Sequence, residues 1–470
     1  MIEFTKLGTN VNKIKDYIER DGGRFCDLSL GVRFMWGDEF DVEYAELNDT
    51  LILKESGPEF TDVFYYPIGS DAQGALLAIE EYARAKNLPL TFCYIDDERA
   101  ELLKQRYNSV KVFFNRDWCD YVYTAEQFKT YAGKKLSGQR NHVNKFKRLY
   151  PDYSFKKIEP CDISRIIAFL DEYNASKVVQ GWTEDVDKKT VYSLLENMFE
   201  LNQTGGYLEV NGKIIAVSVG ERVGNTLMVH VEKALTEYDG VYPTMAQEFA
   251  RAVAVDGVEF INREEDCGDI GLRTSKTQYR PIEIRAKNIV RVRTLFREIQ
   301  PPVTLRTARL TITDITEDDK ERYAKLYLDD DLNKWWGYDY RDDLDGKEPT
   351  AEYFYSFQQK LKDLKEEYSL AVRLDGVMIG ELVLHNFDYY GGVEIGFRFF
   401  KEHQGKGYAF ESAERLKEYC FDNLRAKTVK SRCFKENLPS RKLIEKLGLK
   451  LTSSDQIKYY FQKGIDTHIL

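Results

Sequence analysis

The hydrophobic pattern near the C-terminus predicts a strand, a tight turn and a helix in direct succession. The apolar run Val393–Phe400 predicts the strand, and Ala409, Ala413, Leu416 and Cys420 share one face of the predicted helix. The start of such a helix presents unpaired backbone N–H groups at the positive end of its dipole. A strand, turn and helix of this kind therefore suit a pyrophosphate group.

The turn itself has a recognisable spacing. Gln404, Gly407 and Ala409 fit the pattern Q/R-x-x-G-x-G/A.

Two hairpins are predicted upstream, because residues 207–216 contain an Asn-Gly turn between apolar stretches and residues 369–380 contain an Asp-Gly turn. The two hairpins therefore predict a common architecture for the middle and last parts of the chain.

Overlaying the two hairpins extends this comparison. Further along the chain, the overlay places Asp239–Thr244 opposite Gln404–Ala409, with Tyr242 over Gly407. Pro243, which follows Tyr242, lacks a backbone N–H. A bulky side chain and a missing donor would spoil a pyrophosphate site in the middle part.

A fainter copy precedes both parts. Residues 91–107 overlie residues 431–447 without gaps, and both predict a short strand followed by an amphipathic helix. Proline-containing breaks lie at Pro151 and at Pro301-Pro302. We therefore expect an α/β (α+β) fold with mixed, mostly antiparallel central sheets in three tandem modules: residues 1–150, 151–300 and 303–470.

Composition restricts the class of protein. The chain has 470 residues, of which 43% are hydrophobic and 31% are charged, as in ordinary globular proteins. No apolar run approaches the ~20 residues of a membrane span, and the N-terminus lacks an apolar signal core, so we expect no membrane insertion. The seven cysteines include no C-x-x-C pair, which predicts neither a structural metal nor a disulfide framework and favours the cytoplasm. The net charge of −10 argues against nucleic-acid binding by the whole surface but leaves room for a local basic patch, and we expect no DNA partner.

Residues 303–470 as a whole resemble the GNAT superfamily of acyl-CoA transferases, in the branch that contains ribosomal-protein N-terminal acetyltransferases. The resemblance rests on Leu305–Leu310, on Gln404–Ala409 with Glu411, and on Glu436–Gly448. It implies acetyl-CoA as cosubstrate, an amine acceptor that is a small molecule or a peptide, and no metal. The cofactor-binding residues that it implies are Phe397, Arg398, Phe399, Gln404, Gly405, Lys406, Gly407, Tyr408, Ala409 and Asn437.

Acetyl transfer also needs a base for the amine and an acid for the thiolate. Glu394, on the strand beside the expected thioester position, is the candidate base. Ile444 stands where the family often has a Tyr acid, and Ser440 matches the Ser of the N-terminal acetyltransferase branch. His385 and His403 are not assigned a role, because a lone His in a loop is more often structural.

Residues 1–290 resemble the soluble catalytic domain of phosphatidylglycerol lysyltransferases. The matching motifs are Gly133–Phe146, His230–Ala234, Tyr238–Gly240 and Phe260–Asp266. Members of that family contain two GNAT-like units and take an aminoacyl group from aminoacyl-tRNA. The resemblance and the charges predict a polar groove lined by Lys135, Arg140, Asn141, Glu232, Tyr242, Arg263, Glu264, Asp266 and Arg273.

The basic residues of this groove belong to a longer segment that could meet tRNA phosphates. Its members are Lys129, Lys134, Lys135, Arg140, Lys145, Lys147 and Arg148. A solvated basic helix face is the alternative, and an internal salt-bridge network is the alternative for the acidic residues. Because the sequence contains no membrane domain, we expect a soluble acceptor rather than a lipid.

Three hypotheses follow from the sequence. In the first, the last module acetylates a primary amine, and the first two modules are a second transferase or a scaffold that presents the substrate. In the second, aminoacyl-tRNA-dependent transfer by residues 1–290 is the main activity. In the third, the chain is a binding module that senses acyl-CoA or a peptide. The Gln404–Ala409 loop argues against the third hypothesis for the last module, whereas the altered loop around Tyr242 leaves it open for the middle module. The oligomeric state does not follow from the sequence.

Overall fold

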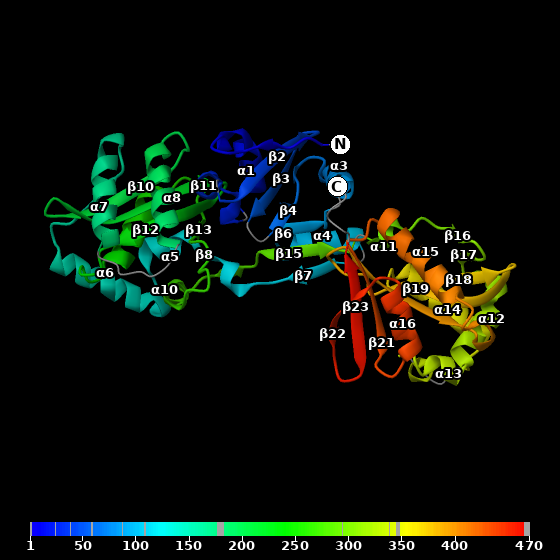
Figure 1. Cartoon of the computed structure of the whole chain (residues 1–470). Coiled ribbons are helices and arrows are strands. Elements are labelled where there is room, and N and C mark those ends of the chain that lie inside the picture. Colours follow the sequence, from blue (N-terminus) through cyan, green and yellow to red (C-terminus); the bar gives the residue numbers. More distant parts are fainter. Residues whose placement is uncertain are drawn as a thin grey trace. The chain divides into compact units, whose positions relative to one another are not determined.

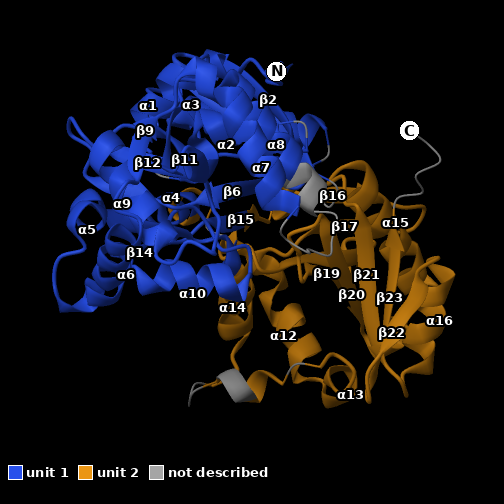
Figure 2. Ribbon diagram, turned by 90° about the vertical axis from the view of Figure 1, so that its left-hand side faces the viewer, with its two compact units in different colours: residues 1–103, 112–290 blue, residues 104–111, 291–470 orange. Residues whose placement is uncertain are grey.

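A computed structural model describes residues 2–464 except 24, 38, 58–59, 87, 108–109, 176–182, 294, 338 and 345–347. The described residues form three sheets with helices around them (Figure 1). The chain divides into two compact units (Figure 2). We call residues 1–103 with 112–290 the N-terminal unit, and residues 104–111 with 291–470 the C-terminal unit.

The first sheet is 8-stranded, in the order β1-β2-β3-β4-β6-β15-β7, with β5 paired to β3. Its strands are β1 (Thr5–Lys6), β2 (Asp41–Leu47), β3 (Thr50–Gly57), β4 (Phe60–Phe64), β5 (Ile68–Gly69), β6 (Thr91–Ile95), β7 (Val110–Phe113) and β15 (Asn288–Val292). The helices in this part are α1 (Lys15–Asp21), α2 (Leu30–Trp36), α3 (Ala72–Ala85) and α4 (Asp97–Tyr107). Helix α3 buries Ala75, Leu76, Ile79 and Ala83, which recur at helical spacing.

The second sheet is 7-stranded, in the order β14-β8-β13-β12-β11-β10-β9. Its strands are β8 (Asp120–Thr124), β9 (Ser154–Lys157), β10 (Thr204–Val210), β11 (Lys213–Val223), β12 (Thr226–Ala234), β13 (Phe260–Asn262) and β14 (Glu283–Arg285). The helices are α5 (Ala125–Thr130), α6 (Ser137–Leu149), α7 (Ile163–Ala175), α8 (Thr183–Asn197), α9 (Val241–Val253) and α10 (Ile270–Gln278).

The third sheet is 8-stranded, in the order β16-β17-β18-β19-β20-β21-β23-β22. Its strands are β16 (Thr304–Arg306), β17 (Thr311–Asp314), β18 (Tyr368–Leu374), β19 (Val377–His385), β20 (Gly392–Phe399), β21 (Thr428–Phe434), β22 (Lys450–Ser454) and β23 (Lys458–Gly464). The helices are α11 (Leu295–Glu298), α12 (Lys320–Leu328), α13 (Asp330–Asn333), α14 (Ala351–Asp363), α15 (Tyr408–Asp422) and α16 (Leu438–Lys446).

All three sheets share one pairing pattern. Three consecutive antiparallel strands are followed by a parallel pair: β4 with β6, β12 with β13, and β20 with β21. The predicted fold class, with mixed and mostly antiparallel sheets in tandem, is therefore confirmed. The predicted hairpins also form, with Asn211 and Gly212 at positive φ in one turn and Asp375 and Gly376 in the other.

The sheets do not follow the expected module boundaries. Strand β8 precedes Pro151 in sequence but lies in the second sheet, next to β13. Strand β15 lies in the first sheet, although it follows every strand of the second in sequence. In the third sheet, β23 occupies the position next to the parallel pair that β8 occupies in the second. The first two modules therefore exchange strands.

The longest α-helices in the described part have 15 residues. No described helix combines the length and the apolar character that crossing a bilayer requires.

Candidate functional site

Strands β20 and β21 separate in the middle of the third sheet. They pair in parallel only from Gly392 to Glu394, whereas β20 remains paired to β19 as far as Phe399. The Ser431 hydroxyl donates a hydrogen bond to the carbonyl of Ile395 at 3.0 Å, at the point where the strands diverge. Beyond it, Gly396–Phe399 line a cavity of about 1030 Å³.

The cavity brings together nearly all the residues predicted for acetyl transfer. Its walls include Glu394, Phe397, Arg398, Phe399, Gln404, Gly405, Gly407, Tyr408, Ala409, Asn437 and Ser440. Lys406 belongs to the same loop, and its carbonyl accepts a hydrogen bond from Arg309 at 3.2 Å. Residues from one strand, one loop and two helices thus meet at one cavity.

The loop before α15 has the conformation that its glycines allow. Gly407 is the N-cap of the helix at φ 84°, and Gly405 has φ 73°. A Cβ built on Gly407 would meet nothing closer than the Arg309 guanidinium, at 3.4 Å. The first N–H groups of α15 therefore lie at an open helix start, which suits an anion.

A single carboxylate supports this loop. Glu411 accepts hydrogen bonds from the Thr307 hydroxyl at 2.5 Å and from Arg309 Nε at 2.7 Å. Burial raises the pKa of Glu411, but these hydrogen bonds lower it by more. The pKa therefore lies below its usual value, and the carboxylate stays charged. The Leu305–Leu310 motif thus holds the loop in place through Arg309, which also stacks on Tyr408 at 4.6 Å.

Three of the predicted cofactor-binding side chains have structural partners. The Gln404 side chain donates to the carbonyl of Phe399 at 2.9 Å, which fixes the end of β20. The Asn437 side-chain oxygen accepts from the Ser440 backbone N–H at 3.2 Å and caps α16. Arg398 is 5% exposed and pairs with Glu381 at 2.7 Å, between the rings of Tyr327 and Trp336. The Arg398 side chain is therefore committed to a buried ion pair.

Three titratable side chains lie in a row across the floor of the cavity. His385 on β19 pairs in register with Glu394 on β20. Tyr368 on β18 pairs with Leu384, so Glu367, one residue earlier, falls opposite His385. Directly opposite residues face the same side of a sheet, and all three residues line the cavity.

His385 is the residue of this row that sequence reasoning passed over. Its Nε2 lies 3.7 Å from the Glu394 carboxylate and 3.7 Å from a Cβ built on Gly396. The pKa of His385 lies below its usual value, mainly because the side chain is buried. The nearby Glu394 raises this pKa, and Arg432 lowers it. The imidazole is therefore neutral near pH 7. Glu394 accepts hydrogen bonds from Asn386 Nδ2 and pairs with Arg432 Nε, both at 3.0 Å.

Two segments after β17, residues 335–338 and 388–390, carry clustered aromatic residues. Trp335 and Trp336 line the cavity, and Tyr338 lies outside the described residues. Asp388 instead accepts from the backbone N–H groups of Tyr390 and Gly392 and closes a turn. The cavity wall thus includes the Trp pair.

The corresponding helix start in the N-terminal unit is closed. Gly240 is the N-cap of α9 at φ 83°, so Gly240, and not Tyr242, is the counterpart of Gly407. The overlay was wrong by two residues, because it could not locate the first helical residue. A Cβ on Gly240 would lie 2.3 Å from the His142 carbonyl of α6. Helix α6 therefore covers the position that is open in α15.

The acidic residues predicted for the N-terminal groove lie in the segment Phe260–Asp266 and, for Glu232, on β12. Arg263 pairs with Glu232 at 2.7 Å, and Glu264 pairs with His230 at 2.7 Å. Asp266 accepts from Arg273 Nε at 2.9 Å and from the Tyr121 hydroxyl at 2.6 Å. The structure thus brings Glu232, Arg263, Glu264, Asp266 and Arg273 together as a network of internal ion pairs.

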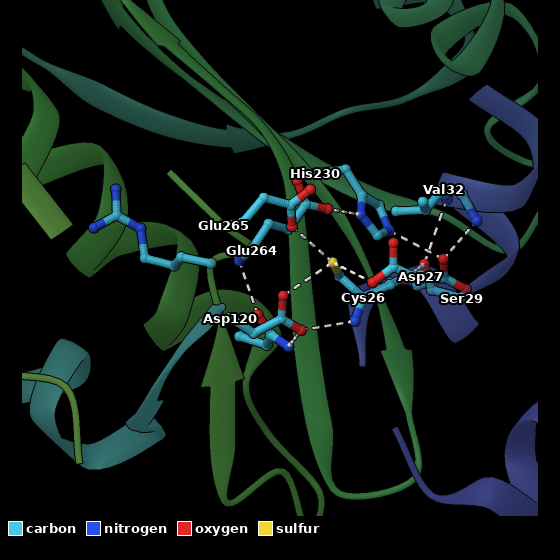
Figure 3. Close-up of polar contacts among 12 residues, drawn as sticks. Cys26, Asp27, Ser29, Val32, Asp120, His230, Glu264 and Glu265 are labelled. Carbon is cyan, nitrogen blue, oxygen red and sulfur yellow. Dashed lines mark hydrogen bonds and ion pairs between the residues drawn. The ribbon is translucent and has the colours of Figure 1, made fainter. Parts of the chain in front are cut away.

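His230 lies between two carboxylates in this network (Figure 3). Burial lowers the pKa of its imidazole, but hydrogen bonds to Glu221 and Glu264 raise it to about 9. Cys26 lies close by and faces Asp27, Asp120 and Glu265 (Figure 3).

Lys287 neutralises the carboxylates around Cys26. Cys26, Asp120 and Glu265 have the spacing of potential metal ligands. The Lys287 ammonium lies 2.7 Å from Asp27, 2.8 Å from Asp120 and 3.0 Å from Glu265. Burial raises the pKa of the Cys26 thiol well above its usual value, so the thiol is not reactive. The cation in this cluster is supplied by the chain itself.

The basic residues of the predicted groove lie on and before α6. Lys135 and Asn141 are exposed. Arg140 donates to the carbonyls of Tyr131 and Gly133, which ties it to the preceding turn. Lys147 pairs with Glu248 at 2.9 Å. Part of the basic segment thus supports the fold. The remaining predicted groove residue, Tyr242, lies in the first turn of α9 and packs against the core.

Comparison with known proteins places each unit in a family. Residues 23–291, more than half of the chain, match the family described as "Phosphatidylglycerol lysyltransferase, C-terminal". Residues 309–450 match the family described as "Acetyltransferase (GNAT) domain". GNAT domains use acetyl-CoA as cosubstrate.

Individual relatives agree with these matches. A solved structure, a conserved protein of unknown function from Bacteroides thetaiotaomicron, is 30% identical with a TM-score of 0.59, over 62% of this chain and 100% of that one. "Uncharacterized N-acetyltransferase YnaD" of Bacillus subtilis is 31% identical over 22% of this chain, which spans 60% of that relative's length. "Uncharacterized N-acetyltransferase p20" of Bacillus licheniformis is 26% identical over 31% of this chain and 81% of its own length.

The two matches agree with the two units of the structure. The open loop at Gly407 lies in the segment that matches the acetyltransferases, and the closed helix start at Gly240 lies in the segment that matches the lysyltransferases. The chain therefore belongs to the family of phosphatidylglycerol lysyltransferase C-terminal domains and carries a GNAT acetyltransferase domain at residues 309–450.

Proposed function

We propose that the C-terminal unit transfers the acetyl group of acetyl-CoA to a primary amine, which is a peptide N-terminus, an amino acid or a small metabolite. The observation that carries this proposal is the open helix start at Gly407 beside the divergent strands β20 and β21. The N–H groups of the loop would hold the pyrophosphate, and pantetheine would lie against Gly396–Phe399.

His385, with Glu394 beside it, supplies the proton acceptor in this proposal. The amine nitrogen attacks the thioester carbon, and its proton passes to the neutral imidazole of His385, directly or through water. Glu394, 3.7 Å away, stabilises the imidazolium that forms. The C–S bond breaks, and the thiolate takes a proton through the Ser440 hydroxyl, which lines the same cavity and regains its proton from water. The predicted base, Glu394, thus acts together with His385.

Gly407→Trp is expected to weaken acetyl-CoA binding by about 100-fold or more. The bulky side chain would keep the pyrophosphate from the backbone N–H groups of the loop, with the loss of two charge-assisted hydrogen bonds. A Trp at φ 84° is also strained. Isothermal titration calorimetry with acetyl-CoA measures the affinity. Gly376→Trp is the matched control, since Gly376 has φ 81° in an open hairpin turn outside the cavity. Unchanged affinity in the Gly407 variant would contradict the site.

For the N-terminal unit we propose a different donor, an aminoacyl-tRNA. The supporting observations are the helix start at Gly240, which α6 closes, and the exposed Lys134 and Lys135 in the turn just before α6. A closed helix start does not suit CoA, whereas exposed lysines suit phosphates spread along an RNA backbone.

Lys135→Glu is expected to weaken tRNA binding and to reduce the slope of log affinity against log salt by about 1. Filter binding at several salt concentrations measures both quantities. Lys13→Glu, at another exposed lysine of the same unit, makes the same charge change and serves as control. Arg140 is a poorer probe because it holds the turn at Tyr131 and Gly133. No retention of tRNA by the unmodified chain at low salt would refute the proposal.

A further inference from the structure

One carboxyl group in the cavity has no role in acetyl transfer. Glu367 follows α14 and directly precedes β18, and it lines the cavity with a partly buried side chain. Its carboxylate accepts one hydrogen bond, from the Ser369 hydroxyl at 3.2 Å. Among the described residues, no Lys, Arg or His forms an ion pair with it, whereas the neighbouring carboxylates Glu381 and Glu394 each pair with an arginine.

The surroundings of Glu367 favour a cation that the chain does not supply. Burial and, after it, the nearby Glu381 raise the pKa of this carboxyl to about 7. Arg398 opposes this effect only weakly, because its guanidinium is engaged by Glu381 at 2.7 Å. A partly buried carboxylate without a cation is costly, and a ligand ammonium group beside it would offset that cost.

The geometry of the sheet gives the distance of this carboxylate from the reacting centre. Glu367 belongs to the edge of β18, and the thioester position lies along β20, two strands away. Two strand spacings of ~4.8 Å place them roughly 10 Å apart. The cavity wall also includes the apolar side chains of Phe357, Leu361 and Trp336, which suit a methylene chain.

We infer that the acceptor carries two cationic nitrogens: one is acetylated beside β20, and the second binds Glu367 as an ammonium group. The substrate class is an aliphatic diamine, or a molecule that presents two amines on a chain of similar length. This inference rests on the proposed acetyl transfer and specifies its acceptor. An apolar monoamine would leave Glu367 without a partner.

The test compares two-cation and one-cation acceptors in the full chain. Initial rates of acetylation would be measured with tetramethylenediamine, pentamethylenediamine and hexamethylenediamine, and with hexylamine as the one-cation probe. We expect the KM for the best diamine to lie about 10- to 100-fold below that for hexylamine, as a charge-assisted hydrogen bond predicts. Glu367→Gln should raise the diamine KM by the same factor and leave the hexylamine KM and the kcat for both amines unchanged.

Glu366→Gln is the matched control. Glu366 is exposed and does not line the cavity, so this variant removes the same charge from the neighbouring position. Equal KM values for diamines and hexylamine in the unmodified chain would overturn the inference. So would an equal loss in the Glu366 and Glu367 variants, which would indicate a general surface charge effect.

A binding measurement separates this inference from the proposed function. Tryptophan fluorescence, with Trp335 and Trp336 in the cavity wall, reports diamine binding without turnover. If diamines bind in a Glu367-dependent manner but are not acetylated, the proposed reaction fails and the cation site stands. If hexylamine and peptide N-termini are acetylated with no preference for a second cation, the reaction stands and the cation site fails.

Discussion

His385→Gln is expected to lower the kcat of acetyl transfer by about 100- to 10,000-fold, the usual contribution of a positioned general base. Gln fills a similar volume but takes up no proton. His385 faces Glu394 across β19 and β20, and its Nε2 lies 3.7 Å from a Cβ built on Gly396. The affinity for acetyl-CoA should stay unchanged, because His385 is remote from the Gly407 loop in the register of the sheet.

The pH profile of kcat/KM tests the same assignment. Burial lowers the pKa of His385, so the imidazole stays neutral, and active as a base, to a lower pH than an ordinary His of pKa ~6.5. The rate should fall only below that pH, and the fall should disappear in His385→Gln. His403→Gln, at a second histidine of the cavity, should keep it. If Glu394→Gln removes the acid limb while His385→Gln keeps it, Glu394 alone is the base.

Lys287→Met is expected to destabilise the N-terminal unit by about 3–5 kcal/mol, as removing one partner of a buried ion cluster does. Asp27, Asp120 and Glu265 would lose the ammonium group that lies within 3.0 Å of each. Burial opposes the charge of Lys287, but these carboxylates raise its pKa well above the usual value, so the cation persists across the stability range. Urea unfolding followed by far-UV circular dichroism, together with calorimetry of thermal unfolding, measures the free energy of unfolding.

Lys188→Met provides the comparison. Lys188 pairs with Asp171 at 3.0 Å, but both side chains are about half exposed. Exposed pairs contribute roughly 0–1 kcal/mol, so this variant should be nearly neutral. Similar losses in the two variants would mean that Lys287 does not hold the carboxylate cluster together.

Local signals in the sequence predicted much of the C-terminal unit and one hairpin of the N-terminal unit. The Asn-Gly and Asp-Gly turns, the strand before Gln404 and the helix after Gly407 depend on short-range patterns, and all of them form. The loop residues meet in one cavity because a strand, a turn and a helix of known lengths leave little freedom in their placement.

The missed features depend on contacts between distant residues. His385 looks like an isolated histidine until the register of β19 against β20 sets it opposite Glu394. The covering of Gly240 by α6 joins segments about 100 residues apart, which no local pattern reports. Likewise, Lys287 lies in a basic stretch of the sequence, but its ion pairs join it to carboxylates from three other segments. It therefore lies at the centre of a buried ion cluster.

The exchanged strands β8 and β15 have a consequence for how this chain can be divided. A fragment of residues 151–300 would lack β8 and would expose the free edge of β13, an edge prone to pair with other chains. A fragment of residues 1–150 would lack β15 from between β6 and β7. The two lysyltransferase-like modules look like a duplication, but neither contains all the strands of its own sheet. We therefore expect that neither folds as a separate fragment. Protease nicking or gene splitting between them should yield aggregates rather than two working halves.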